Sequence, residues 1–70
     1  MITVQKAMYE LINNQGLTAY RIAKDIGTSQ VLVKSYLDGK VKSPQYKFCK
    51  AIYDNYKLVV FPYTEDELKG

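Results

Sequence analysis

Apolar residues recur at intervals of three and four along residues 4–56, a spacing that places them on one face of a helix. Polar or glycine-containing segments divide this pattern into four groups, so it predicts four helices that pack through their apolar faces. The groups are Val4, Ala7, Met8, Leu11 and Ile12; Ala19, Ile22, Ala23 and Ile26; Val33, Tyr36 and Leu37; and Tyr46, Cys49, Ile52, Tyr53 and Tyr56.

Capping residues predict where these helices begin and end. Three hydroxyl side chains stand just before an apolar group, where each can accept a hydrogen bond from an amide of the first turn. They are Thr3, Thr18 and Ser29. Gly27 follows the second group and can adopt the positive φ that ends a helix. Ser43 as the cap and Pro44 at the first helical position predict the start of the fourth helix.

The period of the pattern changes after Tyr56. The β-branched and aromatic run Lys57–Phe61 predicts a short C-terminal strand. A single strand needs a partner, which is either Ile2–Val4 or the same strand of a second subunit. Thr64–Glu67 fits a capping box that opens a last helical turn. We therefore expect one mainly α-helical domain over residues 1–70, with four to five short helices and a short C-terminal β-strand.

Composition narrows the class of protein. A chain of 70 residues forms one domain with a thin core. It has no histidine and one cysteine, Cys49, which excludes disulfide frameworks, zinc sites with paired ligands and Ser–His or Cys–His catalysis. We expect no enzyme activity, no cofactor and no small-molecule substrate. No apolar run is long enough to span a bilayer, so we expect a cytoplasmic protein without a membrane partner.

Charge is unevenly placed along the chain. The formal net charge is +3. Residues 16–50 carry seven basic side chains against two acidic ones, a balance of +5, whereas residues 51–70 carry two basic against four acidic, a balance of −2. A basic central segment in a small domain favours a polyanionic partner.

Residues 18–40 have the features of two helices joined by a tight turn. Such helices cross closely, which favours the small Ala23 at the crossing and Gly27 in the turn. This segment resembles the helix-turn-helix of the lambda repressor/Cro-like family, and the resemblance covers about residues 3–56. The matching residues are Thr18, Ile22, Ala23, Ile26, Gly27, Ser29, Val33, Tyr36, Gly39 and Lys40, with Pro44 at the next helix.

The resemblance implies a lambda repressor-like fold and a sequence-specific DNA-binding regulator. The helix over residues 30–38 would enter the major groove, where Gln30 can pair with adenine and Lys34 with guanine or a phosphate. Lys40 and Lys42, in the following loop, suit phosphates of the flanking strand. The complete set of candidate DNA contacts is Thr18, Arg21, Ser29, Gln30, Val31, Leu32, Lys34, Ser35, Lys40 and Lys42.

Two departures from the family pattern keep a second hypothesis open. Ala19 stands where many members carry a glutamine that contacts the DNA backbone. Val31 and Leu32 are apolar where polar residues are more usual, and as exposed aliphatics they could meet thymine methyl groups or a protein. The alternative function is therefore a helix-turn-helix used as a protein-interaction module, such as an antirepressor or anti-defence factor.

The resemblance also implies a Cro-like repressor, of the kind found in phages and mobile elements, acting as a homodimer on a double-stranded DNA operator. The predicted C-terminal strand is the expected dimerisation element. Alternation would place one pair of its side chains on the helical core and the other pair against the symmetry mate. These candidate dimerisation residues are Leu58, Val59, Val60 and Phe61.

Overall fold

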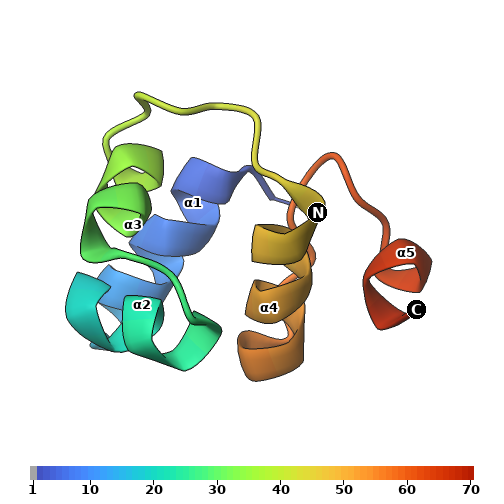
Figure 1. Ribbon diagram of the computed structural model, residues 1–70, viewed down its shortest axis with the longest axis horizontal. Coiled ribbons are helices and arrows are strands. Elements are labelled where there is room, and N and C mark those ends of the chain that lie inside the picture. Colours follow the sequence, from blue (N-terminus) through green and yellow to red (C-terminus); the bar gives the residue numbers. More distant parts are fainter. Residues whose placement is uncertain (1) are drawn as a thin grey trace.

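The computed structural model describes residues 2–70, in which short helices surround one apolar core (Figure 1). α2 and α3 lie side by side at one end of the molecule, α5 lies at the other end, and α4 stands between them. α1 packs against α3 and continues directly into the π-helical turn η1. The elements are α1 (Val4–Tyr9), η1 (Glu10–Asn14), α2 (Ala19–Ile26), α3 (Gln30–Leu37), α4 (Tyr46–Tyr56) and α5 (Glu65–Lys69).

The predicted caps of α1, α2 and α3 are present. The Thr3 side chain accepts a hydrogen bond from the backbone N–H of Lys6, and Thr18 and Ser29 make the equivalent bonds at the next two helices. Gly27 ends α2 in the left-handed region, with φ 73° and ψ 36°. Thr64 begins α5 with the predicted capping box, in which the carboxylate of Glu67 accepts from the Thr64 backbone. The mainly helical fold is thus confirmed.

The predicted start of α4 is wrong by two residues. The helix begins at Tyr46, and Gln45 stands at the N-cap with no side-chain hydrogen bond to the first turn. Pro44 is buried and precedes the helix, and the backbone of Gln45 is still extended, with φ −78° and ψ 154°. The chain thus stays extended past the buried Pro44 before the first helical turn forms.

The predicted C-terminal strand does not form. Among residues 2–70, this part of the chain makes one isolated parallel bridge, between Ile2 and Val60. The N–H of Ile2 donates to the Val59 carbonyl at 3.2 Å, and the N–H of Phe61 donates to the Ile2 carbonyl at 2.7 Å. Lys57 takes a left-handed conformation at the end of α4, and a turn follows Val60 at once, so little extended chain lies between them.

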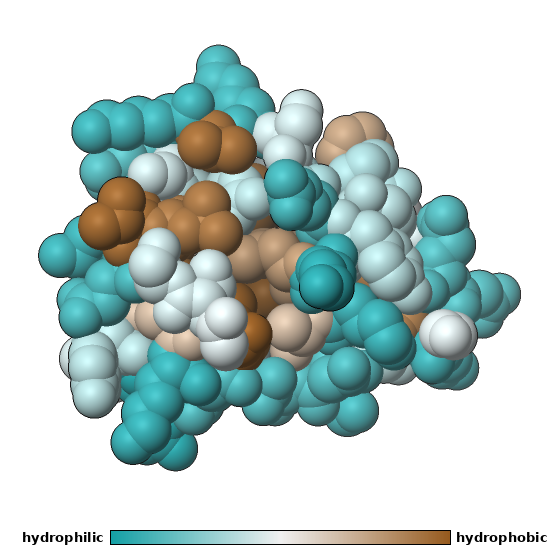
Figure 2. Space-filling view, in the orientation of Figure 1, coloured by the Kyte–Doolittle hydropathy of each residue, from teal (hydrophilic) through white to brown (hydrophobic). Residues whose placement is uncertain are grey.

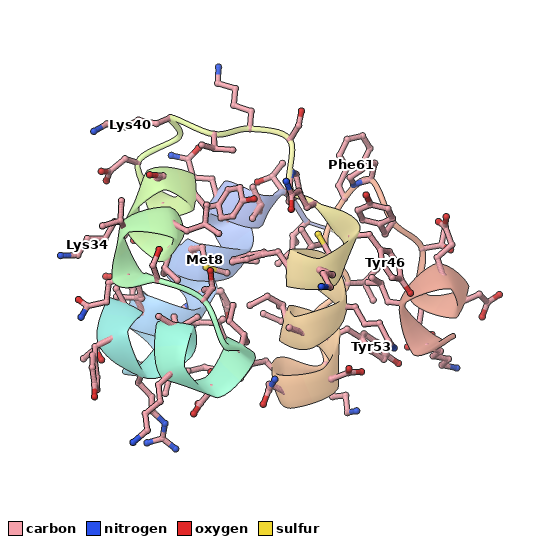
Figure 3. The ribbon with its side chains drawn as sticks, viewed as in Figure 1. Met8, Lys34, Lys40, Tyr46, Tyr53 and Phe61 are labelled. Atoms are coloured by element: carbon pink, nitrogen blue, oxygen red, sulfur yellow. The ribbon has the colours of Figure 1, made fainter. Side chains whose placement is uncertain are left out.

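The buried side chains come mainly from the predicted helical faces, with Met8 central among them (Figure 3). Tyr46 is an exception, because it was predicted on the apolar face of α4 and is 38 % exposed. Cys49 is buried as expected for a small apolar residue, and burial raises the pKa of its thiol to about 11. Sequence reasoning missed two members of this core, Phe48 and Leu68. The full set is Val4, Ala7, Met8, Leu11, Ile22, Ala23, Val33, Tyr36, Phe48, Cys49, Ile52, Tyr53, Val60 and Leu68.

Candidate nucleic-acid interface

The connection between α2 and α3 has the tight geometry that the sequence predicts. The N–H of Thr28 donates to the Ala23 carbonyl at 2.9 Å, which closes the end of α2 just after Gly27. Ser29 then caps α3 by accepting from the Leu32 N–H at 3.2 Å. Ala23 and Val33 are both buried, so the two helices pack closely and leave the opposite face of α3 to solvent.

Three side chains of the predicted interface lie on the exposed face of α3. They are Gln30, Val31 and Lys34. Val31 is 73 % exposed, which is unusual for an aliphatic residue in a small domain. Leu32 differs from the expectation, because it is half-buried and packs against the core. Ser35 is also half-buried, and its hydroxyl donates to the Val31 carbonyl at 2.8 Å. The outward surface of α3 is therefore narrower than predicted.

Two lysines on this side of the molecule, Lys34 and Lys40, have no carboxylate partner among residues 2–70. Figure 3 shows Lys34 and Lys40 extending away from the body of the molecule on the same side. Within residues 2–70, the basic side chains in ion pairs are Arg21, Lys50 and Lys69. From α2 to the first turn of α4, the exposed lysines outside these pairs are Lys24, Lys34, Lys40, Lys42 and Lys47. Their charge is available to an anionic ligand.

Arg21 is less available than the sequence predicts. Its Nε lies 3.0 Å from Oδ2 of Asp25, one turn further along α2. The Tyr56 hydroxyl of α4 donates to the same oxygen at 2.9 Å, and this bond, with Arg21, lowers the pKa of Asp25. Burial and the bond to Asp25 raise the pKa of Tyr56 to about 12. The Arg21 charge is thus compensated within the fold.

A crevice between α2 and the first turn of α3 was not predicted. It has a volume of about 320 Å³ and is lined by Tyr20, Ala23, Lys24, Thr28 and Gln30. A spacing of four residues separates Tyr20, Lys24 and Thr28. It places Tyr20 and Lys24 on one face of α2 and Thr28 in the turn that follows. That spacing is the signal by which the sequence could have shown the crevice.

A second hollow lies on the other side of the turn, between α3 and α4. Figure 2 shows it as apolar surface near the centre of the view, with hydrophilic side chains around it. Its volume is about 380 Å³. The lining consists of Ile26, Gly27, Thr28, Leu32, Gln45, Lys47 and Phe48. The half-buried Leu32 therefore belongs to this hollow and to the core.

The four predicted dimerisation residues do not form a common surface. Val60 is fully buried and contributes to the core of its own chain. Leu58 and Val59 are half-buried against that core. Phe61 is 57 % exposed and is the one of the four that presents most of its side chain to solvent. An alternating two-faced strand is therefore the wrong description of this segment.

Comparisons of the chain with family models, with curated proteins and with solved structures found no match. The resemblance to lambda repressor/Cro-like proteins therefore rests on the motif residues alone. Among residues 2–70, no helix has the length and apolar character to cross a membrane. The same residues contain no group of three or more potential acidic or cysteine ligands placed to hold a metal ion.

Proposed function

We propose that this protein is a sequence-specific DNA-binding regulator that places α3 in the major groove of double-stranded DNA. The observation that carries the proposal is the exposed face of α3, which presents Gln30, Val31 and Lys34 to solvent. Lys40, which has no carboxylate partner within residues 2–70, extends from the same side of the molecule (Figure 3). An α-helix fits the width of the major groove, and its side chains then reach the base edges.

The three exposed side chains suit different base edges. The amide of Gln30 can donate to and accept from adenine at the same time. The isopropyl group of Val31 can pack on a thymine methyl group, because no polar atom of Val31 needs a partner there. Lys34 carries donors only, so guanine acceptors or a phosphate oxygen suit its ammonium group. Gln30 and Val31 therefore favour A·T pairs, and Lys34 favours a G·C pair if its partner is guanine rather than a phosphate.

Contacts to the sugar–phosphate backbone would set the position of α3. Lys40 and Lys42 are exposed in the loop after α3, where they can reach the flanking strand. The hydroxyls of Thr18 and Ser29 already accept backbone bonds, but each retains its own proton to donate to a phosphate oxygen. Arg21 contributes less, because Asp25 compensates its charge.

We further propose that two copies bind one operator as a homodimer and act as a repressor. An eight-residue helix such as α3 is about 12 Å long, which is enough for only a few base pairs. Two half-sites about 34 Å apart, on one face of the duplex, supply the length of sequence that a regulator needs. Phe61 is the exposed apolar residue of the C-terminal segment and suits the contact between copies.

Selection against random duplex DNA, followed by sequencing of the bound fraction, tests the proposal. We expect one enriched site with two-fold symmetry. Scrambled duplexes of the same composition provide the control for non-specific retention by the lysines. Recovery of the same sequence distribution from the bound and unbound fractions would contradict sequence-specific binding.

A protein-interaction module is the second candidate, and two observations favour it. Val31 is 73 % exposed, and the hollow between α3 and α4 has an apolar floor that includes Leu32 and Phe48. Both features could contact a protein rather than DNA. Retention on heparin and on plain duplex DNA at low salt, with release as salt rises, separates the two functions, because phosphate contacts depend on salt and apolar protein contacts do not weaken with it.

A further inference from the structure

The crevice between α2 and α3 brings together four polar side chains. Tyr20, Lys24, Thr28 and Gln30 line it around the side chain of Ala23. Tyr20 is 59 % exposed although its ring is large and apolar. Within residues 2–70, no side-chain hydrogen bond or ion pair occupies these four polar groups, so all four are free to bind a ligand in the crevice.

The hydrogen-bond donors that line the crevice suit a ligand with several negatively charged oxygens. The Tyr20 and Thr28 hydroxyls, the Lys24 ammonium and the Gln30 amide can each donate a hydrogen bond. No carboxylate lines the crevice. The floor is the small Ala23, which is 4 % exposed, and it leaves room for a group to approach the two helices closely. A ligand with several acceptor oxygens and negative charge meets all of these donors.

We propose that the crevice holds one phosphate of the DNA backbone, a contact that rests on the proposed function. The phosphate would bridge α2 and α3 through Tyr20 and Lys24 on one side and Thr28 on the other. Gln30 lines the crevice and also begins α3, so a phosphate bound there fixes how far the first turn of α3 enters the groove. Tyr20, Lys24 and Thr28 are in this sense positioning residues for the base contact of Gln30.

The first test compares Tyr20→Phe and Lys24→Gln with the unchanged protein on the selected operator. Each loses one donor, and we expect each to bind roughly tenfold more weakly, with the preferred sequence unchanged. Lys24→Gln should also make the salt slope shallower by about one for each bound copy. Tyr20→Phe removes only the hydroxyl, so unchanged affinity of that variant would show that this hydroxyl does not bind the phosphate and would overturn the phosphate role of Tyr20.

Lys69→Gln is the matched control, because it removes the same charge from α5 at the opposite end of the molecule (Figure 1). We expect its affinity for DNA to stay within about twofold of that of the unchanged protein, since Lys69 lies away from the proposed contact face. The exposed ion pair of Lys69 with Glu65 contributes little to the stability of the fold. Thermal melting of all variants checks that none has lost its fold.

The second test identifies the phosphate by replacing single phosphates of the operator with neutral methylphosphonates. The unchanged protein should lose affinity at one particular position in each half-site. Lys24→Gln should be insensitive at that position and remain sensitive at the others. The same sensitivity profile for both proteins would overturn the phosphate site while leaving the α3 contact intact. Failure of the unchanged protein to select any site would instead overturn the proposed function.

Discussion

The carboxylate of Asp25 joins α2 to α4 and compensates the positive charge of Arg21. It accepts from Arg21 on its own helix, at 3.0 Å, and from the Tyr56 hydroxyl of α4, at 2.9 Å. Both bonds favour the ionised carboxylate, so the pKa of Asp25 lies below its ordinary value of 3.8. Its contribution to stability is therefore complete above that value and is lost as the pH falls through the lowered pKa.

Tyr56→Phe tests this interaction at the residue scale. The variant loses the bond to Asp25, so we expect a lower urea midpoint than that of the unchanged protein at pH 7. The difference should shrink below about pH 4, where protonation of Asp25 weakens the bond in the unchanged protein. Urea unfolding at several pH values measures it. Tyr20→Phe removes a hydroxyl that makes no such bond and provides the control. A difference that stays constant between pH 7 and pH 3 would contradict the role of Asp25.

Gln30→Ala tests the proposed base contact. We expect the variant to lose about 1–3 kcal/mol of discrimination at a matched adenine, because the bidentate amide pair is removed. Lys42→Ala should weaken binding to all sequences alike, because its proposed partner is a phosphate. Competition binding with duplexes substituted at single positions separates the two effects. Selection of the same site by Gln30→Ala would show that α3 lies in a different orientation.

At the scale of elements, α5 shows how a very short helix is held by tertiary contacts. Five residues do not form a stable helix in isolation. Leu68 is fully buried, and two side chains of α4 donate to the last carbonyls of α5, Tyr46 to Glu67 and Lys50 to Leu68, both at 2.9 Å. Tyr53 of α4 also donates to Glu65, and Figure 3 shows Tyr46 and Tyr53 on the side of α4 toward α5.

Leu68→Ala should therefore destabilise the protein strongly. Large-to-small changes at fully buried leucines cost about 2–5 kcal/mol, through lost burial and the cavity that remains. Lys69→Ala, at the adjacent exposed position, should change stability by less than about 0.5 kcal/mol. Urea unfolding of both variants gives the comparison. Equal stability of the two variants would mean that α5 is not docked on α4 in solution.

The sequence predicted those helix boundaries that depend on local bonds. The caps at Thr3, Thr18 and Ser29 and the left-handed Gly27 involve neighbouring residues only, so they are visible in the pattern. The start of α4 at Tyr46 follows a buried Pro44, and the burial of a residue before a helix is a tertiary contact that no local signal reveals.

The prediction of a C-terminal strand was wrong for a related reason. The β-branched residues of Lys57–Phe61 favour extended chain, but the available partner is the single residue Ile2. Helical spacing predicted the exposure of Gln30, Val31 and Lys34 but not the partial burial of Leu32 and Ser35. The crevice requires the turn to bring Gln30 beside Tyr20 and Lys24. Local spacing thus predicts one face of a helix, and contacts between helices determine the rest of the site.

At the scale of the whole molecule, opposite charges lie at opposite ends. The lysines of α3 and the following loop are at one end, and the exposed carboxylates of Glu65, Asp66 and Glu67 are on α5 at the other (Figure 1). The longest extent of the molecule is 27 Å. The screening length at physiological salt is only about 8 Å, so the acidic end does little to reduce the attraction of the basic end for an anionic partner, such as the DNA that we propose.

DNA binding should consequently depend steeply on salt, although the net charge is only +3. If each copy neutralises about three phosphates, two copies release the counterions of about six, and log K should fall with log salt at a slope near −5. Fluorescence anisotropy with a labelled operator between about 50 and 200 mM salt measures this slope.

Asp66→Asn changes the net charge by one at the acidic end, and we expect it to leave the slope unchanged. Lys40→Gln makes a charge change of the same size at the basic end, and it should make the slope shallower by about one per copy. Affinity that stays flat over this range would contradict contact between the lysines and DNA phosphates, and equal effects of the two substitutions would show that net charge rather than the α3 face governs binding.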